Sequence, residues 1–189
     1  MKKPIGVALI ALCTGLAGCS NIISATRDEP IQEDYTSRTV GKFVDDQVID
    51  TKASVNINKG SQALQQSRVS VTSQNGIVLL VGQVPNQSVK QEAEQIVQQV
   101  RGVRQIQNRL SVGPNATLLM QSQDAFITTQ IKTKLLAEKN LPSSQIKVIT
   151  EAGIVYLMGR VTQAQADLAV SIIQQVGGIQ QIVKIFEYI

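Results

Sequence analysis

The sequence predicts an α+β fold made of two tandem copies of one small unit. One ten-residue pattern occurs at 75–84 and again at 152–161, with a turn glycine, five mostly apolar residues and a second glycine six positions after the first. Segments with the apolar spacing of amphipathic helices precede and follow each copy. The 189 residues leave room for two units of roughly 70 residues. Each unit is expected to run helix, strand, strand, helix, strand, with a three-stranded mixed sheet packed on two helices.

The repeated stretch is typical of the second strand of a β-hairpin. In the first copy, Asn75-Gly76 is the turn chemistry expected where φ is positive. Val69 and Val71 alternate with polar residues just before this turn, as a half-buried strand requires. The second glycine, Gly82, indicates a bulge or a close backbone approach, and not a phosphate cradle.

Helices flank the hairpin of the first unit. Apolar spacing predicts the first helix over Asp45 to Asn58 and a second helix after Pro85 that ends at Gly102. The apolar positions from 103 to 112 predict a third strand, parallel to the second because a helix joins the two.

The second unit repeats this order after the break at Gly113-Pro114-Asn115. Its first helix is expected to begin at Asp124, and its last strand contains Ile182 and Phe186. Strands in both units carry apolar residues on both faces. One face serves the unit's own helices, so we expect the two units to pack on each other through the other face.

The first 18 residues have the organisation of a bacterial lipoprotein signal peptide. Two lysines precede an apolar run that is too short to remain as a membrane-spanning helix. The run ends in Leu16-Ala17-Gly18-Cys19, which resembles a lipobox. This resemblance implies cleavage before Cys19 and acylation of its sulfur and amine. Ser20, in place of an aspartate, implies sorting to the outer membrane with the chain facing the periplasm.

These observations predict five segments. They are a signal peptide (1–18), a lipidated N-terminus with a flexible tether (19–43), the first domain (44–112), a linker (113–121) and the second domain (122–189). The tether is polar and mixed in charge, and some twenty residues reach at most about 70 Å when fully extended.

The composition lowers the expectation of catalysis or cofactor binding. The chain has no histidine, and its two cysteines are Cys13, in the cleaved leader, and Cys19. The commonest nucleophile, general-base and metal arrangements are therefore missing. Asp45, Asp46 and Asp124 are explained as caps at helix starts. We expect no enzyme activity, cofactor, metal or small-molecule substrate.

The charge balance argues against nucleic-acid binding. The net charge is +4, from 18 basic and 14 acidic residues, and loss of Lys2 and Lys3 with the leader reduces it to +2. This is too balanced for a general nucleic-acid binder.

The repeated unit resembles the BON domain of bacterial envelope proteins. The matching features are the two glycines around the apolar strand, the Gly102-Val103 and Gly178-Ile179 steps, and Ile127-Thr128-Thr129 in the leading helix. A lipobox followed by two such domains is similar to dual-BON outer-membrane lipoproteins associated with division and outer-membrane stress. The resemblance implies binding to anionic phospholipid through the second domain, a role in outer-membrane integrity, and no catalysis. Where such relatives carry a lipid-facing tryptophan, this chain has Phe126.

The first helix of the second unit supports a lipid contact independently. Its core positions are Ile127, Ile131 and Leu135, within an arc of about 80°. The predicted lipid-binding residues lie on the opposite side: Phe126, Thr129, Thr133 and Leu136, with Lys132 at the edge. An apolar wedge beside a cation suits an anionic membrane surface.

Three alternatives stay open at this stage. The face of Phe126 could instead pack on the first domain. The matching helix of the first domain has neither an aromatic residue nor a lysine at the positions of Phe126 and Lys132. Leu118, Leu119 and Met120 could fill the domain interface or extend the wedge. The protein could also be an interaction scaffold for an envelope assembly or cell-wall partner.

Overall fold

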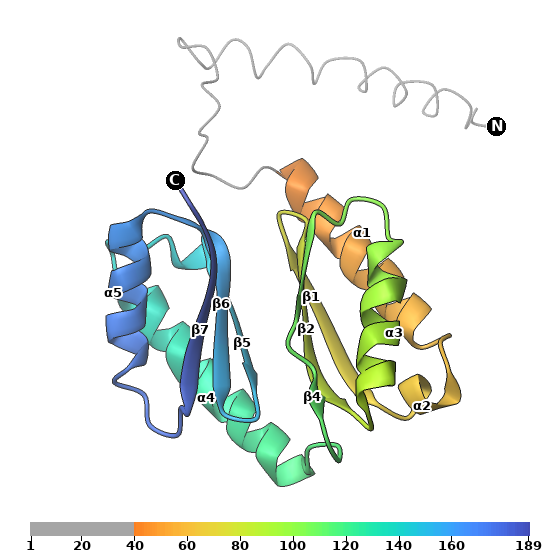
Figure 1. Ribbon diagram of the computed structural model, residues 1–189. Coiled ribbons are helices and arrows are strands. Elements are labelled where there is room, and N and C mark those ends of the chain that lie inside the picture. The colour runs from red at the N-terminus through yellow and green to blue at the C-terminus, as the bar shows by residue number, and fades with distance from the viewer. Residues whose placement is uncertain (1–39) are drawn as a thin grey trace, which may run out of the picture. The chain divides into compact units, whose positions relative to one another are not determined.

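The computed structural model describes residues 40–189, and these residues form two units with the same order of elements (Figure 1). The first contains α1 (Val40–Ile57), α2 (Gln62–Gln65), β1 (Arg68–Gln74), β2 (Ile77–Val84), α3 (Gln87–Gln98), β3 (Gln105–Asn108) and β4 (Ser111–Val112). The second contains α4 (Leu118–Ala137), a short 3-10 helix (Ser143–Gln145), β5 (Lys147–Glu151), β6 (Ile154–Val161), α5 (Gln163–Ile173) and β7 (Gln181–Tyr188).

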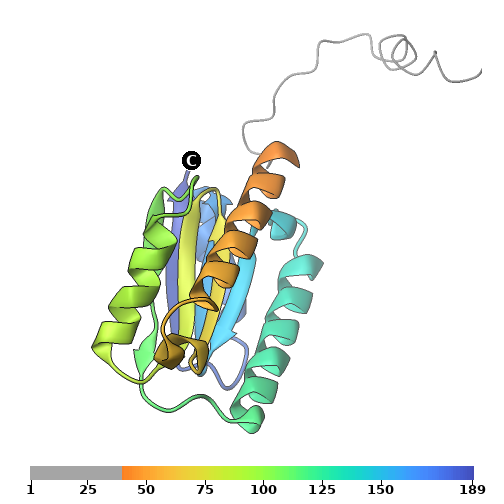
Figure 2. The same cartoon turned by 90° about the vertical axis from the view of Figure 1, so that its right-hand side faces the viewer.

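The sheet topology confirms the predicted α+β unit. In the first unit β1 pairs antiparallel with β2, which pairs in parallel with β3 and β4. In the second unit β5 pairs antiparallel with β6, which pairs in parallel with β7 over eight residues. Two helices cover one face of each sheet, and Figure 2 shows α1 and α3 lying side by side over the first.

A buried carboxylate holds each hairpin turn. The turn residues Asn75 and Gly76 have φ of 53° and 76°, and both backbone N–H groups donate to the Asp46 carboxylate, at 2.8 and 2.9 Å. In the second unit Ala152 and Gly153 adopt φ of 50° and 74°, and their N–H groups donate to Asp124, both at 2.8 Å. The prediction that these aspartates cap helix starts is therefore wrong. Asp46 and Asp124 lie inside α1 and α4 and cap the turns of the neighbouring hairpins. Asp45 also lies inside α1, so it does not cap the start of that helix.

The second glycine of each repeat marks a close approach between two backbone segments. Gly82 has a φ of 124°, and a Cβ at this position would overlap the carbonyl oxygen of Arg68 on β1. Gly159 is in the same position on β6, where a Cβ would come 2.5 Å from the carbonyl oxygen of Gln145. The interpretation of these glycines as sites of close backbone approach is confirmed.

The third strand of the first unit differs from the prediction because it is broken in two. Between β3 and β4, the side-chain oxygen of Asn108 accepts a hydrogen bond from the N–H of Leu110 at 3.3 Å. The ammonium of Lys90, on α3, donates to the Leu110 carbonyl at 2.6 Å. These local contacts replace strand pairing at Leu110, whose side chain fills the core of the unit.

Both long helices begin earlier than predicted. α1 starts at Val40, five residues before Asp45, and α4 starts at Leu118, six residues before Asp124. The Thr117 hydroxyl accepts a hydrogen bond from the N–H of Met120 at 3.3 Å and so caps the earlier start of α4. The prediction placed the start at Asp124 because the buried positions of the helix begin there. Residues 118–123 of α4 precede these buried positions.

Each unit has its own core, and a third cluster joins the two sheets. The first core lies between the sheet and α1 and α3, and the second between its sheet and α4 and α5. The shared cluster is formed by alternate residues of β2 with residues of β6 and β7: Ile77, Leu79, Val81, Tyr156, Met158 and Ile185. The expectation that the units pack on each other through the second face of their strands is confirmed.

Polar pairs surround the shared cluster. The buried Glu151 carboxylate accepts hydrogen bonds from Gln83, at 2.8 Å, and from Arg68, at 3.2 Å. Glu187 accepts from the Asn75 amide at 2.6 Å and from Arg104 at 3.1 Å. These contacts satisfy the carboxylates at the rim and define the register between the sheets.

Candidate functional site

Packing against the second core determines which side of α4 faces outward. Ile127, Ile131 and Leu135 are buried in the core of the second unit, as their spacing predicts, and Asp124 is bound to the hairpin turn. The opposite side of the helix therefore carries no residue that the fold needs for its core. We call this side the outward face of α4 and define it by exposed residues within an arc of about 120°. They are Leu118, Leu119, Ser122, Ala125, Phe126, Thr129, Thr133, Leu136 and Ala137.

Large apolar side chains on the outward face of α4 are open to solvent. Phe126 is 63% exposed and Leu136 is 77% exposed. The alternative that Phe126 packs on the first unit is thereby excluded for the described part of the chain. An exposed aromatic residue and leucine on one helix face are typical of an interaction surface.

The first turn of α4 enlarges this surface. Leu118 and Leu119 are 80% and 79% exposed, so they do not fill the interface between the units. Both lie about two turns before Phe126 on the helix and share its face, whereas Met120, which is 42% exposed, lies outside this face. Of the two roles left open by the sequence, the structure supports extension of the wedge.

The hydroxyl groups on the outward face of α4 are already hydrogen-bonded within the helix. Thr129 donates to the Ala125 carbonyl, Thr133 to the Thr129 carbonyl and Ser122 to the Leu118 carbonyl, each at 2.9 Å. This pairing reduces the cost of moving the hydroxyls out of water. The two threonines thus add methyl groups to the surface without adding an unpaired donor.

Lysines border the face but do not interrupt it. Lys132 is exposed and lies about 20° outside the arc of the outward face. It has no salt-bridge partner among residues 40–189. The structure therefore brings together all five residues that the sequence singled out: an apolar pair, two threonines and a flanking cation.

The matching helix of the first unit has a feature that sequence reasoning missed. At the positions that correspond to Phe126 and Lys132, α1 has Val48 and Ser54. However, its early start places Phe43 on α1, where it helps to line a shallow hollow of about 310 Å³. The first helix therefore also carries an exposed aromatic residue, which the predicted start at Asp45 had left out.

The described residues contain neither a membrane-spanning helix nor a cluster of metal-binding side chains. Among residues 40–189, no helix combines the length and the hydrophobicity needed to cross a bilayer. No group of acidic residues in the same range is suited to hold a metal ion. The predicted lipidation site, Cys19, lies outside the described residues.

Comparison with known families accounts for the repeated architecture. The profile of the BON domain matches twice, at residues 45–114 and 123–188. The chain belongs to the BON-domain family. The two units described above are therefore its first and second BON domains, and the sequence resemblance is confirmed.

Three relatives are similar to this chain over most of their length. The chain is 38% identical over 152 residues to the outer membrane lipoprotein DolP of Haemophilus influenzae, covering 80% of this chain and 79% of that protein. It is 36% identical to the 21 kDa hemolysin of Actinobacillus pleuropneumoniae, covering 80% and 78%. It is 32% identical to the osmotically-inducible protein Y of Escherichia coli, covering 91% and 87%.

These relationships agree with the lipobox in the leader. The chain is an outer-membrane, lipid-anchored lipoprotein with two BON domains. None of the three relatives carries the name of an enzyme.

Proposed function

We propose that this lipoprotein binds anionic phospholipid through the outward face of α4 and thereby supports the integrity of the outer membrane. In this proposal the mature chain starts at Cys19, whose acyl chains hold it at the periplasmic side of the membrane. Residues 19–39, which precede α1, act as the tether, and the second BON domain makes the additional contact. The protein has no catalytic role.

The observation that carries the proposal is an uncharged outward face with large exposed apolar side chains that the core does not need. Burial of an exposed Phe126 or Leu136 side chain in the headgroup region contributes about 1.5–3 kcal/mol. A lysine near an anionic surface contributes about 1 kcal/mol more. Such a contact is weak alone, but the acyl anchor supplies a high local concentration of membrane.

Vesicle co-sedimentation of residues 20–189 tests the lipid contact. We expect binding to phosphatidylglycerol vesicles that weakens with salt, and little binding to phosphatidylcholine vesicles. Phe126→Ala should weaken binding about tenfold, because a large buried ring is lost. Lys132→Glu should weaken vesicle binding more at low salt than at high salt.

The first BON domain provides matched controls for both variants. Val48→Ala and Ser54→Glu make the equivalent changes on α1 and should leave vesicle binding unchanged. Unaltered binding in both α4 variants would refute the assignment of this face. Binding to an envelope protein that survives loss of vesicle binding would instead favour the scaffold function.

A further inference from the structure

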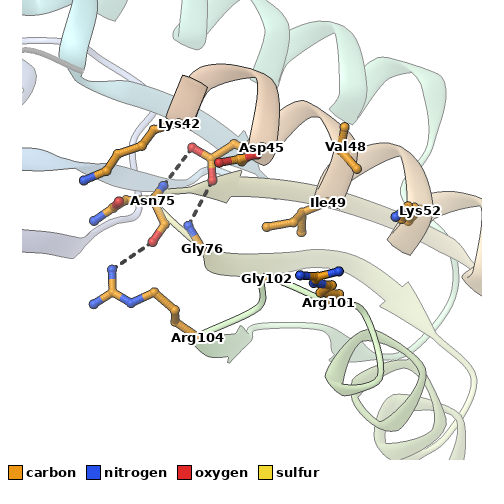
Figure 3. A pocket seen from close by; sticks show the side chains of 11 residues that line it. Lys42, Asp45, Val48, Ile49, Lys52, Asn75, Gly76, Arg101, Gly102 and Arg104 are labelled. Carbon is orange, nitrogen blue, oxygen red and sulfur yellow. Dashed lines mark hydrogen bonds between the residues drawn. The ribbon is translucent and has the colours of Figure 1, made fainter. Parts of the chain in front are cut away.

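The first BON domain has a hollow between three of its elements (Figure 3). α1 forms one side and the turn between α3 and β3 forms the other, with Asn75-Gly76 of the hairpin turn at one end. The hollow has a volume of about 470 Å³, which is within the range of small-ligand sites. It is distinct from α4 and from the proposed lipid contact.

Four basic side chains surround this hollow. Lys42 and Lys52 come from α1, and Arg101 and Arg104 come from the turn that follows α3 (Figure 3). Two carboxylates also line it, but the Asp46 carboxylate is buried and bound to the N–H groups of the hairpin turn. Among the lining residues cations therefore outnumber carboxylates by two, and by one when Glu187, the ion-pair partner of Arg104, is counted.

The cations differ in how they are held. Arg104 donates to the Asn75 carbonyl at 2.9 Å and to the Glu187 carboxylate at 3.1 Å, so its guanidinium is oriented in advance. Lys52 and Arg101 are exposed and have no salt-bridge partner among residues 40–189. These two cations are available to an incoming anion.

The second BON domain shows that the fold does not require these charges. When Asp46 is aligned with Asp124, and Gly102 with Gly178, the positions of the four cations can be compared directly. In the second domain they are occupied by Met120, Gln130, Gly177 and Gln180. All four are uncharged, so the basic rim is a property of the first domain alone.

We propose that the hollow of the first BON domain binds a phosphate group. Guanidinium groups offer paired N–H donors that match phosphate oxygens, and ammonium groups supply additional charge. The shared chemistry is a phosphate ester, carried by a lipid headgroup or by a soluble molecule. This site would hold one phosphate in a defined position, whereas the outward face of α4 contacts a bilayer surface.

Amide chemical shifts of the ¹⁵N-labelled, lipidated full chain test the proposal. The protein is kept in dodecyl maltoside micelles, which contain no phosphate, and titrated with inorganic phosphate at constant ionic strength. We expect saturable shifts at Gly76, Arg101 and Gly102, with chloride and acetate producing none that saturate at the same concentrations. Absence of saturation, or equal binding of acetate, would overturn the assignment of a phosphate site.

Paired substitutions distinguish a specific phosphate site from general attraction of phosphate to a positively charged protein. Lys52→Gln combined with Arg101→Gln should weaken phosphate binding by about tenfold or more, since two charge-assisted contacts are lost. The control Lys59→Gln combined with Lys139→Gln removes the same charge elsewhere and should have no effect. Equal affinities of the two double variants would also overturn the proposal. All four side chains are exposed, and unchanged amide spectra outside the hollow would show that the fold is kept.

The source of the phosphate is identified with three further probes. Glycerol phosphate, dihexanoyl phosphatidylglycerol and dihexanoyl phosphatidylcholine are compared, with both lipids below their micelle-forming concentrations. Saturable binding of the phosphatidylglycerol, stronger than that of phosphatidylcholine, would identify an anionic lipid headgroup. Binding of glycerol phosphate alone would identify a soluble phosphate ester, and both results support a phosphate site.

Discussion

Asp46 and Asp124 make the same contact in the two BON domains. Each side chain leaves the first helix of its domain, is almost fully buried at 1% and 6% exposure, and accepts two backbone hydrogen bonds. The turn N–H groups point away from the ladder of the hairpin and need a partner. A carboxylate from the helix supplies it and links the helix to the turn.

Removal of either carboxylate should destabilise its domain. We expect Asp46→Ala and Asp124→Ala each to lower the free energy of unfolding by about 2–3 kcal/mol, because turn N–H groups lose their acceptors. Their exposed neighbours provide controls, and Asp45→Ala and Gln123→Ala should change it by less than about 0.5 kcal/mol. Urea denaturation monitored by circular dichroism measures all four. Equal effects of the buried and exposed pairs would contradict this role.

Helical periodicity correctly predicted which side chains of α4 are exposed, but it could not predict the hydrogen-bond partners of Asp124. The exposure of Phe126 and Leu136 follows from their spacing relative to Ile127, Ile131 and Leu135. The role of Asp124 does not, because its partners lie 28 and 29 residues away in the chain. A local pattern cannot distinguish a carboxylate that caps its own helix from one that caps a distant turn.

At the scale of elements, α1 and β1 are joined by another carboxylate. The Asp50 side chain, on α1, accepts a hydrogen bond from the N–H of Ser73 at 2.5 Å. The ammonium of Lys147, at the start of β5, lies 4.0 Å away. Burial nevertheless raises the pKa of Asp50 above its ordinary value of 3.8, because loss of hydration outweighs these favourable contacts.

The raised pKa predicts a pH dependence of stability. A raised folded-state pKa means that the folded protein holds the Asp50 proton more tightly than the unfolded chain. The resulting stabilisation is present at acidic pH and is lost as the pH rises through the folded-state pKa. Relative to Asp50→Asn, the wild type should therefore be more stable at acidic pH, near the unfolded-state pKa of about 3.8, than at neutral pH. Urea denaturation of both proteins from acidic to neutral pH measures the difference, and a constant or increasing advantage of the wild type would contradict the prediction.

The order and type of the long elements could be predicted from the sequence, but several boundaries could not. The connecting helix predicted the parallel pairing of β2 with β3, and the repeat extended this prediction to β6 and β7. The break after Asn108 depends on Lys90 of α3, whose ammonium donates to the Leu110 carbonyl and whose carbonyl accepts from the Asn108 amide. The start of α4 depends on the Thr117 cap, which lies outside the apolar stripe.

At the scale of the whole molecule, the shared cluster between the sheets couples the two BON domains. Leu79 on β2 is fully buried in this cluster, together with Tyr156 and Met158 of β6. The next residue, Leu80, points to the opposite side and belongs to the core of the first domain. Two adjacent leucines of equal size thus belong to different clusters, and substitutions at these positions can test the shared cluster and the domain core separately.

Substitution of these leucines should reveal the coupling. Leu79→Ala should cost about 3 kcal/mol and also increase hydrogen exchange in β6, because β6 loses part of its buried cover. Leu80→Ala is the matched control and should increase exchange mainly in the first domain. Mass spectrometry of exchanged peptides measures both effects. Unchanged exchange in β6 of the Leu79 variant would show that the domains are stable independently.

The sheet-to-sheet contact also bears on how the two halves of the chain could diverge. Two copies of a single BON unit that associated through such sheets would be a homodimer, in which every substitution appears twice. Joined in one polypeptide, each copy can change alone while the common interface is kept. The result is visible in the helices that face away from that interface, where one copy has Phe126 and exposed leucines and the other has a basic rim. Tandem duplication thus allows each BON domain to carry a surface that the other domain lacks.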